Sequence, residues 1–208
     1  MTKKLFTLQY QPDGEGSPHH MSENVKPDQW EWDNYPVNPF ELVIKNHYEI
    51  TITDPEITSV DFDFYGNITA YTSQDFLTVC NSLGVSYRAV PVDLRLAGGT
   101  AVMKTYSIFL PGDYMSLLDA DRSEAEIELV VETGEPMSNS ILPATPMYSK
   151  ISKFVALQID LPELFFCVDI FCLVCTDDFR KAVLAANLRG IGFMPLDDAY
   201  VYDPWADW

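Results

Sequence analysis

Cysteine and histidine are the side chains with which this chain could bind a metal or activate a nucleophile. Cys172 and Cys175 have the Cys-x-x-Cys spacing of half a zinc site. They lie in the apolar run 165–175, which is typical of a buried strand, and residues three apart in a strand point to opposite faces. No second Cys or His pair stands nearby. We therefore interpret these two cysteines, together with Cys80 and Cys167, as buried core thiols.

Histidine, the usual proton carrier near neutral pH, occurs only three times, as His19, His20 and His47. None of them belongs to a metal-spaced pair, and no phosphate-binding glycine loop or nucleophile motif is present. The sequence therefore predicts no catalytic residues, no metal and no cofactor, and it favours a protein that is not an enzyme. The alternative is a hydrolase or transferase that uses two paired carboxylates, because some of the 31 acidic residues will lie close together in any fold.

The charge of the chain is strongly negative. Its 31 acidic residues against 13 basic ones give a formal net charge of −18. Nucleic acid and anionic membranes both need a basic footprint, so neither is expected as a partner. The charge favours a basic protein partner, although an acidic surface can also serve solubility alone, as in a general acidic scaffold or a nucleic-acid mimic.

The acidic residues gather in two regions. In the first, Glu124, Glu126 and Glu128 alternate with Ala125, Ile127, Leu129 and Val131, which predicts a strand with an apolar face and an acidic solvent face. Asp119 and Asp121 precede it. This region is either an ordinary solvated strand face or a docking surface for a partner.

The second acidic region is the tail, residues 197–208, which mixes acids with aromatic residues. It contains four Asp, two Tyr and two Trp and no basic residue. The tail either packs its aromatics against the domain or inserts them into a basic cleft of a partner. Its candidate binding residues are Asp197, Asp198, Tyr200, Tyr202, Asp203, Trp205, Asp207 and Trp208.

Two helices with matching surroundings organise the chain. The first is expected at 74–83, with Thr72 or Ser73 as N-cap and Gly84 at its end; the second follows Thr176 as N-cap, with Gly190 beyond it. In each, Phe lies in the first turn, and a strand ending in Pro-apolar-Asp follows, at 91–93 and at 195–197. We predict an α+β fold with mixed or antiparallel sheets, few helices and two related strand-helix-strand units. Residues 1–208 are expected to form one domain, with a candidate subdivision near 140–150 and a last unit at 151–208.

The C-terminal unit resembles a broad group of bacterial immunity proteins from polymorphic toxin systems. The resemblance is carried by an apolar strand, a capped helix and the run Leu-Arg-Gly-Ile-Gly-Phe-Met-Pro-Leu at 188–196, within the last 50 or so residues. It implies an antitoxin that binds the C-terminal domain of a cognate toxin and occludes its active site. The family has no catalytic residues to carry over, and Cys172 and Cys175 lack the glycine and second pair of its metal-like members.

The location expected for such a protein is the cytoplasm. Residues 1–10 alternate apolar and polar side chains instead of forming the unbroken apolar core of a signal peptide. The apolar stretch 161–174 is interrupted by Pro162, Glu163 and Asp169 and is shorter than the roughly 20 residues that a membrane span needs.

Overall fold

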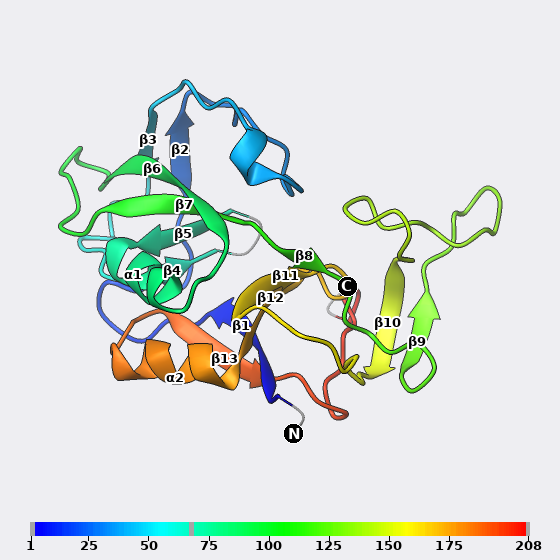
Figure 1. The fold of residues 1–208 in the computed structure, drawn as a ribbon. Coiled ribbons are helices and arrows are strands. Elements are labelled where there is room, and N and C mark those ends of the chain that lie inside the picture. Colours follow the sequence, from blue (N-terminus) through cyan, green and yellow to red (C-terminus); the bar gives the residue numbers. More distant parts are fainter. Residues whose placement is uncertain (1–2, 67–68, 207–208) are drawn as a thin grey trace.

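The computed structural model describes residues 3–66 and 69–206, and within them the fold is α+β, as predicted. Figure 1 shows two sheets with one helix each and a separate pair of strands at one side. The six-stranded sheet has the order β2 (Glu23–Lys26), β3 (Tyr48–Ile52), β6 (Tyr87–Arg95), β7 (Tyr106–Pro111), β5 (Ala70–Ser73) and β4 (Phe64–Tyr65). The five-stranded sheet has the order β13 (Ile191–Pro195), β1 (Leu5–Tyr10), β12 (Cys172–Thr176), β11 (Leu164–Cys167) and β8 (Tyr114–Met115). The helices are α1 (Gln74–Ser82) and α2 (Asp177–Ala185), a 3-10 turn spans Pro39–Glu41, and β9 (Glu124–Ile127) pairs with β10 (Tyr148–Lys153).

The two predicted strand-helix-strand units are present and have the same topology. In one, α1 connects β5 to β6, and β7 lies between these strands, antiparallel to both. In the other, α2 connects β12 to β13, and the strand between them is β1. The registers also match: Ser73 pairs with Tyr106 as Thr176 pairs with Leu5. The central strand of the second unit therefore comes from the opposite end of the sequence.

Both helices begin with the same cap. The Ser73 hydroxyl accepts a hydrogen bond from the Phe76 amide at 3.2 Å, and the Thr176 hydroxyl accepts one from the Phe179 amide at 3.3 Å. Each hydroxyl also donates to a carboxylate, Ser73 to Asp63 at 2.6 Å and Thr176 to Glu163. The cap thus satisfies a free amide at the helix start and ties the helix to the strand or loop that precedes it.

The helix ends are also alike, but the second ends earlier than predicted. Gly84 has φ +66° after α1, and Asn187 has φ +53° after α2. A hydrogen bond to the carbonyl five residues back closes each turn, from the Val85 amide to Cys80 and from the Leu188 amide to Val183. Asn187, and not Gly190, is therefore the left-handed residue that ends α2.

Gly190 has a different function. It also has a positive φ, +76°, and a Cβ at this position would lie 2.8 Å from the backbone oxygen of Phe64 in the other unit. A side chain would push the two units apart, so this glycine permits their close approach.

The run 165–175, predicted as a single buried strand, is a hairpin. Strands β11 and β12 pair antiparallel, with Cys167 opposite Cys172, and residues 168–171 form the turn, in which Phe171 has φ +47°. All four cysteines are free; Cys80, Cys167 and Cys175 are buried and Cys172 is half-buried. Burial raises the pKa of Cys172 to about 12, so this thiol stays protonated at neutral pH.

The hairpin turn is held by a buried carboxylate. Asp169 is 1% exposed and accepts hydrogen bonds from the amides of Leu117 and Leu118 at 2.5 and 2.9 Å and from the Ser116 hydroxyl at 2.9 Å. These bonds satisfy the carboxylate that would otherwise be costly to bury. They also fix the segment after β8 against the tip of the hairpin.

Ion pairs join the two units at one edge. The Arg189 guanidinium contacts Asp61 at 2.7 Å and Asp13 at 3.1 Å, and the Lys104 ammonium lies 2.8 Å from Asp61 and 2.9 Å from Asp63. Hydrogen bonding to Lys104, followed by that to Arg189, lowers the pKa of the Asp61 carboxyl below its usual value. A general acid needs the opposite shift, so the Asp61 carboxylate is better suited to holding the units together than to proton donation.

Candidate functional site

The two acidic regions meet at an arm that projects from the five-stranded sheet. The arm consists of β9, β10 and the connecting residues 128–147, and Figure 1 shows β10 between β9 and the body of the protein. The register places Tyr148 opposite Ile127 and Ile151 opposite Ala125, with an irregularity after each pair. As a result, Tyr148, Ile151 and Phe154, at a spacing of three residues, all face the core.

Strand β9 differs from its predicted state. Its apolar residues were expected to face the core, but all four residues of β9 are exposed. Ile127 is 42% exposed, and beyond the strand Leu129 is 50% and Val131 94% exposed. The reason is that β10 alone covers the core here, so β9 extends past the body and presents both its apolar and its acidic face to solvent.

The tail continues the arm on the other side of β10. The amide of Ile151 donates to the Tyr202 carbonyl at 2.8 Å, and the amide of Tyr202 donates back to Ile151 at 2.9 Å. The Lys150 ammonium also pairs with the Asp203 carboxylate at 3.2 Å. The order across the arm is thus β9, β10, tail, and the two acidic regions flank one strand.

The tail resolves into a packed part and an exposed part. Tyr200 and Tyr202 are half-buried in the cluster of β10 side chains, and the ring of Tyr200 lies 6.2 Å from that of Phe154 in an edge-to-face arrangement. Burial raises the pKa of Tyr202 to about 12. Trp205 remains 63% exposed. The two tyrosines are therefore structural anchors of the tail, while Trp205 is available to a partner.

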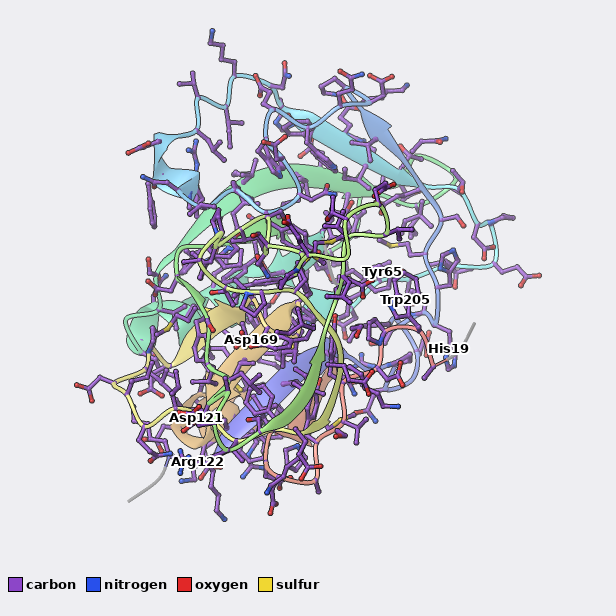
Figure 2. All side chains as sticks on the ribbon, turned by 90° about the vertical axis from the view of Figure 1, so that its right-hand side faces the viewer. His19, Tyr65, Asp121, Arg122, Asp169 and Trp205 are labelled. Carbon is purple, nitrogen blue, oxygen red and sulfur yellow. The ribbon has the colours of Figure 1, made fainter. Side chains whose placement is uncertain are left out.

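The remaining predicted binding residues lie around this surface. Asp121, Glu124, Glu126, Asp197 and Asp198 are exposed; Asp119, Glu128 and Asp203 are half-buried; Asp207 and Trp208 lie outside the described residues. The Arg122 guanidinium binds Asp119 at 2.6 Å, and this hydrogen bond lowers the pKa of the Asp119 carboxyl. Figure 2, which looks onto this side, places Trp205 at one side of the face and Asp121 and Arg122 at the other. We call the surface formed by β9, residues 128–131 and the exposed tail residues the arm-tail face.

Most basic side chains of the protein are already paired with its own acids. Eight of the 13 lysines and arginines form ion pairs: Lys3, Arg95, Lys104, Arg122, Lys150, Arg180, Lys181 and Arg189. The acidic surplus therefore remains on the surface with few nearby bases to neutralise it. On the arm, Glu124 and Glu126 have Lys153 and Lys150 opposite them in β10, and Lys150 also binds Asp203.

The arm-tail face combines exposed apolar side chains with exposed acidic ones. Within the part of the chain that the structure describes, no three His, Cys, Asp or Glu side chains group as metal ligands would. The exposed apolar residues of the arm were missed as binding candidates from the sequence, because alternation alone indicates two strand faces and not whether a neighbour covers either of them. The pairing of Ile151 with Tyr202 had no sequence signal.

Comparison with known proteins adds no relative. No protein-family model matches the chain, and no curated protein matches it in sequence. No helix in the described ranges is both long enough and apolar enough to cross a membrane.

Proposed function

We propose that this chain is an immunity protein that acts in the cytoplasm, where it binds a cognate toxin domain and neutralises it by covering its active site. The observation that carries the proposal is the arm-tail face, which combines exposed apolar side chains such as Ile127, Leu129 and Trp205 with exposed acids. Such a surface suits a partner that is basic and has apolar pockets. The resemblance of residues 188–196 to immunity proteins supports the same assignment.

Charge accounts for the speed that neutralisation requires. Opposite charges on two proteins raise association rates by factors of about 10 to 1,000 at low salt. Exposed apolar and aromatic side chains supply binding energy that persists at high salt, because burial of apolar surface is not screened by ions. A general acidic scaffold would lack this second contribution, and its binding would disappear as salt rises.

Co-expression tests the proposal. Cells should tolerate production of the basic C-terminal toxin domain encoded immediately upstream only when they also produce this chain. The two proteins should copurify as a stable complex. The association rate should be lower at about 0.5 M salt than at low salt, but the complex should still form at the higher salt. A toxin domain that neither binds nor is neutralised would overturn the proposal. Equal binding to several unrelated basic proteins, lost completely at the higher salt, would assign the chain to the general acidic scaffolds instead.

A further inference from the structure

The outer edge of β9 carries unpaired backbone groups. The Glu128 amide donates to the Met147 carbonyl at 2.9 Å. In an antiparallel ladder, hydrogen-bonded and non-hydrogen-bonded pairs alternate, so Ile127 and Tyr148 form a non-hydrogen-bonded pair. The backbone N–H and C=O of Ile127 therefore point away from Tyr148. Leu129 and Pro136 form a second non-hydrogen-bonded pair. The ladder bonds beside it run from the Val130 amide to the Glu135 carbonyl and from the Met137 amide to the Glu128 carbonyl. The N–H and C=O of Ile127 and Leu129 therefore face outward.

No other element covers this edge among the described residues. The sheet that contains β9 has only β10 as a second strand, and β10 lies on the inner side. Outward-facing donors and acceptors at alternate residues are the template onto which an extended chain adds as a further strand. Such addition is specific when the side chains of the new strand match those already present.

The side chains of the edge define what would match. Glu124, Glu126 and Glu128 point to one face and Ala125, Ile127 and Leu129 to the other, and side chains on neighbouring strands meet directly across the ladder. A matching strand therefore carries Lys or Arg at alternate positions, opposite the glutamates. Apolar residues occupy the positions between them, against Ile127 and Leu129.

A second copy of this chain does not match. If two β9 strands paired antiparallel around Ile127, Glu126 of each copy would face Glu128 of the other, and pairing around Glu126 would place this residue opposite itself. Like charges directly opposite each other destabilise a strand pair. The same acids that exclude self-association, a common protection of exposed edges, thus select a basic strand.

We propose that the outer edge of β9 binds an extended basic-apolar segment of the toxin domain by strand addition, so that β9 becomes an internal strand in the complex. This inference rests on the proposed function, and it specifies which part of the arm-tail face forms backbone hydrogen bonds with the partner. Trp205 lies on the tail, which flanks the opposite side of β10, so it is not part of the added-strand contact.

Amide hydrogen exchange of the full chain, free and bound to the toxin domain, tests the strand addition directly. The amides of Ile127 and Leu129 should exchange rapidly in the free protein and at least about tenfold more slowly in the complex. Unchanged exchange of both amides in a complex that still forms would overturn the inference while leaving the proposed function standing. A free protein that is already dimeric and protected at these amides would show that a second copy covers the edge, which would also overturn it.

Two sets of variants separate the contribution of backbone hydrogen bonds to toxin binding from that of the glutamate charges. Ile127→Pro removes the outward amide without removing a bond to β10, and Ile127→Ala is its control for loss of the side chain; toxin affinity should fall at least about tenfold more in the proline variant. Independently, the triple change Glu124→Gln, Glu126→Gln and Glu128→Gln should weaken binding at least about tenfold. Its control removes the same charge from three exposed glutamates elsewhere, through Glu41→Gln, Glu49→Gln and Glu56→Gln. Equal affinity in the two triple variants, with proline no worse than alanine, contradicts strand addition at β9.

Discussion

Phe76 and Phe179 occupy the same position in the two helices and meet between them. Each is the third residue of its helix, each is fully buried, and their ring centroids lie 6.0 Å apart at an interplanar angle of 70°. Each donates its own amide N–H to the hydroxyl oxygen of the cap residue three positions before it. The contact therefore joins the two strand-helix-strand units through equivalent residues, as a duplicated unit packing against its copy would.

Removal of the Phe179 ring is expected to lower the stability of the fold. Phe179→Ala should lower the free energy of unfolding by about 3–5 kcal/mol, because it leaves a cavity between the helices and removes an edge-to-face ring contact. Leu184→Ala on the same helix is the control, since Leu184 is 53% exposed and its loss should change stability by less than about 0.5 kcal/mol. Urea denaturation followed by tryptophan fluorescence measures both. Similar stability losses in the two variants would contradict the structural role of Phe179.

Loss of the buried carboxylate at the hairpin turn should also destabilise the fold. Asp169→Asn places an amide donor where two backbone amides and a hydroxyl now donate, so at least one of them loses its acceptor. The expected cost is on the order of 3 kcal/mol. Amide exchange at Leu117 and Leu118 should accelerate in the variant. Asp160→Asn, at an exposed position, should leave both measurements unchanged.

The ion cluster between the units predicts a dependence on pH. Because the pKa of Asp61 in the folded protein lies below its ordinary value of 3.8, the carboxylate stabilises the fold at pH values above 3.8. That stabilisation is lost as the pH falls through the lower, folded-state pKa. Asp61→Asn should therefore be less stable than the parent at pH 5–7, by no more than about 1 kcal/mol since Asp61 is half exposed. In denaturation curves the difference should shrink progressively as the pH falls below 3.8; a difference that stays constant would contradict this role of Asp61.

Two substitutions in the tail should separate folding from binding. Tyr202→Ala removes a half-buried ring from the cluster around Phe154 and should lower the melting temperature by several degrees. Trp205→Ala should leave the melting temperature unchanged and weaken toxin binding at least about tenfold, as expected for an exposed aromatic anchor. Calorimetry and binding measurements on the two variants test this separation. A lower melting temperature for Trp205→Ala would show that this ring is also structural.

Local signals were sufficient for the helices. Ser73 and Thr176 as caps, acids in the first turn and Gly84 at the end of α1 all act within one or two helical turns, so the sequence alone predicts where both helices begin. Asn187 shows the limit of such reasoning, because either Asn or a nearby glycine can take the left-handed position. The hairpin at 168–171 was missed since its turn contains no Gly, Pro or Asn and instead depends on the buried bonds of Asp169.

Partners distant in sequence could not be predicted. The placement of β1 between β12 and β13, and of Tyr202 beside Ile151, depends on which strands find each other in the folded chain. The acids of the candidate site were visible in the sequence, but their arrangement around β10 was not. The exposure of Ile127 and Leu129 likewise follows from β9 overhanging the body, a property of the assembled fold and not of the strand itself.

The position of β1 also constrains how the protein is made. Leu5 leaves the ribosome early but pairs with Thr176, and the strand then needs β13 on its other side. At the usual translation rate of about 5–20 residues per second, β1 waits on the order of ten seconds or more for both neighbours. The six-stranded sheet, whose strands all precede residue 112, can form early in synthesis, whereas the five-stranded sheet closes only once β13 has been made. Nascent chains stalled near residue 160 should therefore contain a folded six-stranded sheet and an unpaired β1 to which chaperones can bind.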